Sequence, residues 1–486
     1  MKTFSYLIFC LLAIPAVAQK NTDLPSDFLS KEFHRERRAA FRKELPANSM
    51  AVFFTNPVRN RSNDVDYVYH QDPDFFYLTG YKEPNAVLFI FKEKQTASNG
   101  DAYDEILFVQ PRDALQELWT GRRLGEAGTK ERLGFEQAFN NVEFKKYNLD
   151  FNKFDQVLFF DFKNDVRDDA EDPADLYDLI QQFKKKANYP SADNTVVSRE
   201  PKKNNLNSRD LDGIMDGLRG IKTEAELELI RKAVRISCVG QVEVMKAMKP
   251  GMSEREVQGI HEFVFKKYQA EDLGYPSIVG GGQNGCILHY IDNYKPNITS
   301  REMVLMDLGA EYHGYTADIT RTIPVSGKFS ADQKLIYNLV LKAQEEAMKI
   351  CKPGTTFAQL TQVTKQVVNS GLKDLGIIKN INDQHLYYPH GCCHHIGLDV
   401  HDRGPYEALK ENMVITIEPG IYIPENADCD KRWWGIAVRI EDDFLITKEG
   451  YEHLSVTAPR KPEDIEATMA LPSALDDFVL PGLEGR

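Results

Sequence analysis

A stretch in which two aspartates flank a turn constrains this 486-residue chain more than any other feature. The apolar residues 303–306 run into Asp307, a polar turn with glycines follows, and the chain returns to Asp318. A hairpin centred between Tyr312 and His313 would place the two aspartates directly opposite each other. Cβ atoms of such a pair lie about 4.5–5.5 Å apart, where like charges repel. One or two bound divalent cations would relieve this repulsion, because hard cations select paired carboxylates. Two ordinary exposed aspartates are the alternative.

Three further motifs follow this stretch in order along the chain. They are His390-Gly391-Cys392-Cys393-His394 with 397–401, then Thr416-Ile417-Glu418-Pro419-Gly420, and finally Val438-Arg439-Ile440-Glu441-Asp442. Each motif alone is weak, but four in order with five candidate metal ligands form a specific signal.

Together these motifs resemble the pita-bread metallopeptidases, and among them the aminopeptidase P and prolidase branch. That branch carries a DLG…D hairpin, an HGxxH…GxxVH segment, an EPG strand and a RIED strand in this order. The resemblance covers roughly 221–447. It extends into the N-terminal half through 61–64, 71–80 and 119–125, which look closer to aminopeptidase P than to the dipeptidases.

The resemblance implies an α/β (α+β) fold class. An N-terminal α/β domain is expected, followed by a pseudo-two-fold pita-bread catalytic domain with a curved, mainly antiparallel sheet. The expected boundaries are a signal peptide at 1–18, an aminopeptidase P N-terminal domain at 28–170, a connecting region at 171–220, a catalytic domain at 221–450 and a C-terminal tail at 451–486.

The residues themselves support an internal repeat in the second domain. Thr223 and Glu226 form a capping box that predicts a helix start. Two Lys-Pro-Gly turns, at 249–251 and 352–354, each precede another boxed helix with an apolar stripe. Chance similarity is the alternative, because this tripeptide is a common turn.

The chain start predicts export. Lys2 supplies a positive charge, 6–14 is apolar, and Ala16-Val17-Ala18 is typical of a cleavage site. We therefore expect an exported, periplasmic or secreted protein cleaved near Ala18. Loss of Lys2 changes the formal charge from −13 to −14, which argues against nucleic acid or an anionic membrane as partner.

The resemblance also implies two divalent metal ions, with manganese favoured by oxygen-rich ligation. Asp307 would chelate one ion, Asp318 and Glu441 would bridge, and His394 and Glu418 would hold the other. A metal-bridging hydroxide would attack the peptide bond, and Glu418 would also carry its proton to the leaving amine.

Three further histidines are expected around the substrate by the same resemblance. His401 would stabilise the carbonyl or oxyanion, while His289 and His390 would lie on the prolyl side. Arg439, two residues before Glu441, would share its strand face and orient the carboxylates. Tyr422 would lie on the same face as Glu418 if the strand is unbroken.

Two departures from the family pattern lie beside the histidine ligand. His395 replaces an aromatic or apolar residue, and the sequence assigns it no role. Cys392 and Cys393 stand where small or aliphatic residues are usual. They are interpreted as small apolar filler rather than metal ligands.

The favoured activity is that of an Xaa-Pro aminopeptidase acting on peptides with proline at position two. A prolidase restricted to Xaa-Pro dipeptides shares every motif and differs only in whether chain beyond proline is accepted. A non-catalytic pita-bread binding module is the alternative from another class. A homo-oligomer, either a dimer or a tetramer, is also expected.

Overall fold

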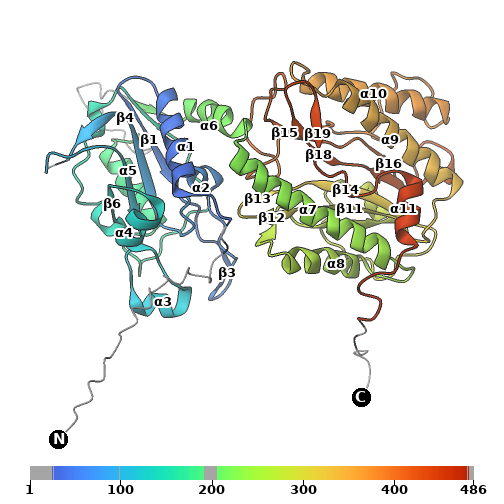
Figure 1. Cartoon of the computed structure of the whole chain (residues 1–486), viewed down its shortest axis with the longest axis horizontal. Helices are drawn as coiled ribbons and strands as arrows, with labels where there is room; N and C mark the ends of the chain where they lie inside the picture. Colours follow the sequence, from blue (N-terminus) through green and yellow to red (C-terminus); the bar gives the residue numbers. More distant parts are fainter. Residues whose placement is uncertain (1–24, 26, 98, 191–204, 479, 481–486) are drawn as a thin grey trace, which may run out of the picture.

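The computed structural model describes residues 25, 27–97, 99–190, 205–478 and 480. The expected signal peptide at 1–18 lies outside the described residues. So does 191–204, which is part of the expected connecting region. Two domains lie side by side, and helix α6 (Asp210–Gly220) runs between them (Figure 1).

The N-terminal domain is built on a six-stranded mixed sheet in the order β6-β5-β4-β1-β7-β8. Its strands are β1 (Ser49–Phe54), β4 (Val87–Thr96), β5 (Ala102–Val109), β6 (Ala138–Asn140), β7 (Gln156–Phe159) and β8 (Leu206–Asn207). Strands β1, β4 and β5 each contain a run of apolar, β-branched or aromatic residues.

Both faces of this sheet are buried, so alternate side chains of β1 enter different cores. Ala51 and Phe53 join the core that includes residues of α1 (Lys31–Glu44). Met50 and Val52 join a second core with α5 (Leu176–Lys186). Helix α5 lies inside the expected connecting region, yet it packs as part of the N-terminal domain.

The remaining elements of this domain are short. They are β2 (Asn60–Ser62), β3 (Val65–Asp66), α2 (Pro73–Thr79), α3 (Ala114–Thr120) and α4 (Gly125–Gly128).

Two helix pairs cover the C-terminal domain. Helix α7 (Glu224–Ala247) packs on α8 (Glu254–Lys267), and α9 (Ala331–Ile350) packs on α10 (Phe357–Asp374). All four helices begin with capping boxes, which confirms the three predicted helix starts, those of α7, α8 and α10. In Figure 1 the α9–α10 pair is drawn above the α7–α8 pair, and α11 (Pro462–Met469) contacts both α7 and α9.

The strands between the helix pairs form short sheets in which every pairing is antiparallel. They are β9 (Asp272–Leu273), β10 (Ile278–Gly281), β11 (Met303–Leu308), β12 (Ala310–Tyr312), β13 (Tyr315–Thr316), β14 (Ile319–Pro324), β15 (Val414–Ile417), β16 (Gly420–Ile423), β17 (Ile436–Arg439), β18 (Asp442–Ile446) and β19 (Tyr451–His453).

Two buried glutamines support the internal repeat. Gln241 of α7 donates from Nε2 to Met306 O at 3.2 Å and to Ile319 O at 2.8 Å. Gln344 of α9 donates in the same way to Ile417 O at 3.1 Å. In each half, a helix amide therefore holds the strand that leads into a predicted ligand.

A buried ion network joins the two domains. Arg219, at the end of α6, donates to Asp74 Oδ1 of α2 at 2.7 Å and also to Asp402. Lys222 donates to Asp402 Oδ2 at 2.6 Å. The side chains of Arg219, Lys222 and Asp402 are at most 2% exposed. Because Asp402 follows His401 directly, this network also holds the loop that carries a predicted catalytic histidine.

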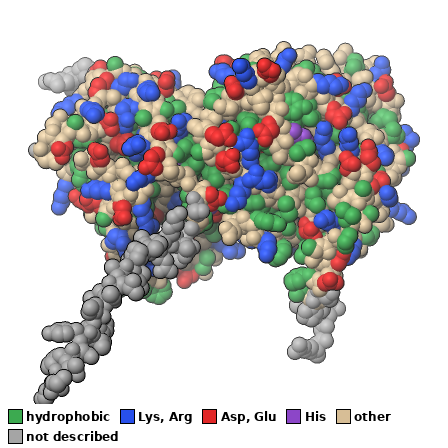
Figure 2. Space-filling model, viewed as in Figure 1, with side chains coloured by type: hydrophobic (Ala, Val, Ile, Leu, Met, Phe, Trp, Pro, Cys, Tyr) green, Lys and Arg blue, Asp and Glu red, His purple; other side chains and the backbone are tan. Residues whose placement is uncertain are grey.

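Part of the expected tail at 451–486 belongs to the C-terminal domain. Strand β19 pairs with β18, and α11 (Pro462–Met469) contacts α7. Among the described residues, no helix is both long and apolar enough to cross a membrane. On the face in Figure 2, acidic and basic side chains occur side by side on both domains.

Candidate metal centre and active site

The aspartate hairpin forms, but its predicted centre is wrong by one residue. Its tip is His313-Gly314, with φ of 51° and 88°, the positive values that a two-residue type I′ turn requires. Asp307 therefore pairs with Thr320 rather than with Asp318. The prediction that the aspartates lie directly opposite each other is wrong. They are diagonal neighbours, and they share a face because a shift of two residues preserves it.

Tyr275 joins the two aspartates. Its hydroxyl lies 2.6 Å from Asp307 Oδ1 and 2.6 Å from Asp318 Oδ1. No motif in the sequence pointed to this tyrosine, which precedes β10 in a loop. Its position shows that the two carboxylates converge on one point.

The other three predicted ligands meet Asp318 at the same place. His394 Nε2 lies 3.5 Å from Asp318 Oδ2, 3.6 Å from Glu418 Oε1 and 3.8 Å from Glu441 Oε1. Ligand atoms of Asp318, His394 and Glu441 all lie within 4.8 Å of one another. The structure thus brings together residues from β11, the end of the hairpin, the 390–394 loop and the ends of β15 and β17.

The carboxylates of this cluster have too few positively charged neighbours to balance them. Burial raises the pKa of Glu418 to about 7. Burial and then neighbouring carboxylates raise the pKa of Asp318 and of Glu441. Burial also opposes ionisation of Asp307, but Arg439 and the hydrogen bond from Tyr275 together lower the pKa of that carboxyl. A single guanidinium therefore serves several buried acids, and more positive charge is needed to ionise them all.

The Oε1 atom of Glu441 indicates whether the cluster suits a metal. Glu441 Oε2 accepts from Thr320 Oγ1 at 2.7 Å, whereas the buried Oε1 has no hydrogen-bond partner within the described part of the chain. Buried polar atoms are rarely left unpaired. Four carboxylates and one imidazole form a donor set that divalent ions such as Mn²⁺ accept, so the residues fit the expected group.

Arg439 and Tyr422 lie beside the cluster as predicted. Arg439 Nη2 donates to Asp307 Oδ2 at 2.5 Å, and its Nη1 donates to the Tyr422 hydroxyl at 3.0 Å. That hydroxyl also lies 2.9 Å from His390 Nε2. Strands β15 and β16 are interrupted at Glu418-Pro419, so the position of Tyr422 follows from these contacts rather than from one unbroken strand.

The three predicted substrate histidines surround the cluster. The His401 ring lies 4.5 Å from the His394 ring, edge to face. Burial lowers the pKa of His390 to about 4, and desolvation also lowers that of His401. The exposed His289 lies close enough for its charge to lower both values further. The individual roles of the three histidines stay predictions.

Sequence reasoning missed Asp443, which follows the RIED motif. Its Oδ2 accepts from the Asp318 backbone amide at 3.1 Å. Burial raises its pKa to about 8. The extra acid after Glu441-Asp442 was the only available signal, and it does not show where the side chain points.

His395 has a structural position rather than a place in the centre. It is fully buried and its Nε2 lies 3.2 Å from Pro405 O. Its ring lies 4.9 Å from that of Phe357 and 5.0 Å from that of Tyr406. Burial lowers its pKa to about 4, so it packs as a neutral aromatic residue.

Comparisons with known proteins agree with this site. The model of metallopeptidase family M24 matches residues 228–448, and that of the aminopeptidase P N-terminal domain matches 34–157. The chain is 35% identical over 458 residues to the Xaa-Pro aminopeptidase of Escherichia coli (strain K12), covering 91% of this chain and 98% of the relative. It is 33% identical over 425 residues to Xaa-Pro aminopeptidase 3 of Homo sapiens, covering 85% and 80%.

Solved structures show the same similarity in three dimensions. Aminopeptidase P from E. coli with the inhibitor Pro-Leu matches with a TM-score of 0.80 and 33% identity, over 91% of this chain and 98% of that one. Proline aminopeptidase P II from Yersinia pestis matches with a TM-score of 0.79. The expected pita-bread architecture is thereby confirmed, and a non-catalytic module is not supported. The chain belongs to metallopeptidase family M24 and, with its N-terminal domain, to the proline-specific aminopeptidase P enzymes, which are hydrolases.

Proposed function

We propose that this protein is an Xaa-Pro aminopeptidase that works with two divalent ions, most readily Mn²⁺. The observation that carries the proposal is the convergence of the five predicted ligands around a buried Glu441 oxygen that has no hydrogen-bond partner among the described residues. Similarity to Xaa-Pro aminopeptidases over nine-tenths of the chain supports the substrate class.

The proposed ligands divide between the two halves of the repeat. Asp307 and Asp318 come from the first half, and His394, Glu418 and Glu441 come from the second. When bound, two such ions would lower the pKa of a water molecule and polarise the scissile carbonyl. Oxygen-rich ligation favours manganese over zinc.

The surrounding side chains position the substrate and move protons. Glu418 would pass a proton to the leaving amine, with His390 Nδ1 3.8 Å from its Oε2. His401 would donate to the carbonyl oxygen as charge develops there. His289 and His390 would line the prolyl side, while Arg439 holds Asp307 and Tyr422 in place.

Removing the His401 imidazole tests its proposed role. His401→Ala should lower kcat by about 10²–10³-fold, the loss seen when an oxyanion donor is removed, with metal content unchanged. His395→Phe is the neighbouring control, because that side chain packs among aromatic rings and should change kcat little. Metal analysis and steady-state kinetics measure both, and metal loss in the alanine variant would make His401 a ligand.

Substrate length separates the proposal from a prolidase. The N-terminal domain matches aminopeptidase P, and the E. coli relative was solved with the inhibitor Pro-Leu. That dipeptide has the chemistry of the product left when one residue is removed from Xaa-Pro-Leu. We therefore propose that the substrate site has open space for residues beyond the proline.

A peptide panel with Mn²⁺ tests this choice. Xaa-Pro-Xaa tripeptides and longer peptides should release their first residue as a free amino acid. Xaa-Pro dipeptides should be poor substrates, because binding contributions beyond proline are missing. Peptides with alanine second are the control. A higher kcat/KM for Xaa-Pro than for Xaa-Pro-Xaa would make the enzyme a prolidase.

A homo-oligomer, dimer or tetramer, remains part of the proposal. Helix α3 buries none of its residues, and its Leu115, Leu118 and Trp119 are 74%, 79% and 88% exposed. Such an apolar face favours contact with another chain. Light scattering after size-exclusion chromatography measures the oligomeric state, and a monomer would refute this part.

Export to the periplasm or outside the cell is proposed from the N-terminal sequence. Lys2, the apolar stretch and Ala16-Val17-Ala18 support it. The mature chain recovered from cells should begin near Gln19. An uncleaved Met1 in the purified native protein would contradict the proposal.

A further inference from the structure

Two adjacent thiols lie between the histidines of the metal-binding loop. Cys392 Sγ and Cys393 Sγ are 3.6 Å apart, and both thiols are free. Cys392 is buried, whereas Cys393 is partly exposed. The proposed catalysis uses neither side chain, although His394 follows directly.

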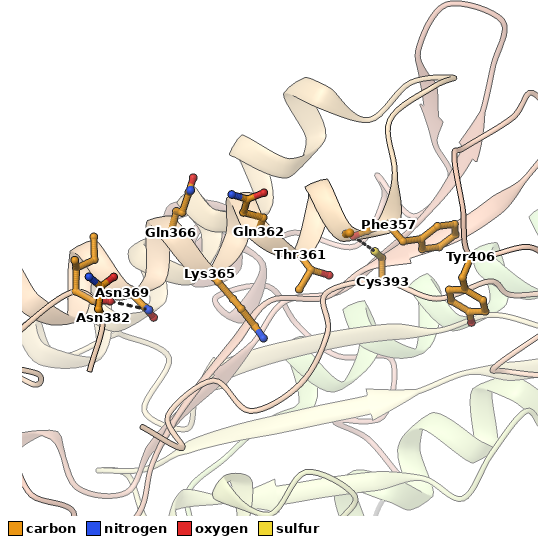
Figure 3. A pocket seen from close by; sticks show the side chains of 11 residues that line it. Phe357, Thr361, Gln362, Lys365, Gln366, Asn369, Asn382, Cys393 and Tyr406 are labelled. Atoms are coloured by element: carbon orange, nitrogen blue, oxygen red, sulfur yellow. Dashed lines mark hydrogen bonds between the residues drawn. The ribbon is translucent and has the colours of Figure 1, made fainter. Parts of the chain in front are cut away.

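Cys393 is reached from solvent through a pocket on the outer side of this loop. The pocket has a volume of about 700 Å³, and its lining includes Phe357, Thr361, Lys365 and Tyr406 (Figure 3). Cys393 Sγ lies 3.9 Å from Phe357 O at the edge of α10. A small thiol-reactive molecule can therefore approach Cys393 without entering the metal centre.

The backbone of the two cysteines is coupled to two proposed ligands. Cys392 O accepts from the backbone amide of Glu418 at 2.7 Å. His394 O accepts from the amide of Thr416 at 3.0 Å. The segment thus lies alongside the chain that carries Glu418, so a change in the Cys392–Cys393 peptide displaces ligands on both sides.

Bonding the two sulfurs requires such a change. Adjacent Cα atoms lie about 3.8 Å apart across a trans peptide, whereas disulfides usually join Cα atoms about 4.4–6.8 Å apart. The sulfurs must also close from 3.6 Å to about 2.05 Å. The backbone must therefore rearrange to change both the Cα–Cα and the Sγ–Sγ distance. A strained, accessible disulfide of this kind is readily reduced again.

We propose that Cys392 and Cys393 are a reversible oxidation site at which a vicinal disulfide disrupts the metal centre. A low-molecular-weight disulfide is the oxidant. The Cys393 sulfur attacks it and releases one thiol, and the Cys392 sulfur then displaces the second thiol from Cys393. The two cysteine protons end on the two released thiols, so atoms and electrons balance. The inference rests on the proposed metallopeptidase function for its activity and metal readouts, whereas the disulfide itself is detected by mass.

Oxidised glutathione tests the proposal on the metal-loaded, full-length enzyme. After removal of the reagent, activity should fall by about 10–100-fold, the range for disturbing the support of a metal ligand, and bound metal should be lost. Peptide mapping should show the 392–393 peptide lighter by two hydrogen atoms. Dithiothreitol followed by Mn²⁺ should restore activity.

Variants identify the thiols responsible, each measured against its own reduced activity. Cys393→Ser and Cys392→Ala should both resist the oxidant. Cys429→Ser, which removes another partly exposed thiol, should respond like the wild type.

Three outcomes overturn the proposal: a disulfide that leaves activity and metal intact, a stable glutathione adduct in place of the disulfide, or equal inactivation of the Cys393 variant. Mass and metal content report on the site even if the reduced enzyme proves inactive on Xaa-Pro peptides, so failure of the proposed function is distinguishable.

Discussion

Replacing Glu441 by glutamine is expected to lower kcat/KM by about 10⁴-fold, the scale seen when one member of a cooperating catalytic set is lost. The glutamine oxygen can still accept from Thr320, but an amide group then occupies the place of the unpartnered Oε1. An amide nitrogen brings no charge and no lone pair for a cation. Steady-state kinetics with Mn²⁺ and metal analysis of the purified variant measure the effect.

Folding must be separated from metal loss in this experiment. The metal-free variant should be at least as stable as the metal-free wild type, because the pKa of Glu441 is raised by burial and by Asp318 and Glu418. Glu452→Gln, at an exposed carboxylate of β19, should leave activity and metal content unchanged. Full activity with full metal content in the Glu441 variant would remove this residue from the ligand set.

Arg219→Met is expected to lower the free energy of unfolding by about 3–5 kcal/mol. The side chain is 2% exposed and pairs with Asp74 and Asp402. Without it these buried carboxylates lose their shared guanidinium and retain Arg403 and Lys222, respectively. The loss should shrink as the pH falls far enough to protonate Asp402, whose pKa Arg219 and Lys222 lower against the effect of burial. Denaturant unfolding measures this loss, as the free energy of unfolding of the first transition.

Arg231→Met is the matched control on helix α7. Arg231 pairs with Glu224 and Glu452, whose side chains are 73% and 45% exposed. Exposed ion pairs contribute about 0–1 kcal/mol, so this variant should unfold nearly as the wild type does. Equal stability losses in the two variants would show that the interdomain network contributes no more than a surface pair.

The sequence predicted features that depend on neighbouring residues. The four capping boxes mark the starts of α7, α8, α9 and α10, because a cap satisfies amides within the same turn. The metal-ligand motifs came from residue types and order, and the structure brings all five residues together.

The sequence did not determine the register of the hairpin strands. An alternating pattern identifies which side chains share a face, and a shift of two residues leaves that pattern unchanged. The choice between the two registers depends on the turn, where His313 and Gly314 both take positive φ. Asp307 therefore faces Thr320, and the pair of aspartates is diagonal.

The supporting groups of the centre were also decided by tertiary structure. Tyr275 reaches the cluster from a loop that carries no motif, and Thr320 and Asp443 reach it from positions just after motifs. Arg219 reaches Asp74 across the domain boundary. The sequence by itself supplied the proposed ligand residues, through four motifs whose order resembles a known family, and the helix starts, because a capping box forms within one turn. Only the tertiary structure decided which carboxylates are buried together and which cation faces them, because burial and charge proximity arise from contacts between residues far apart in the chain.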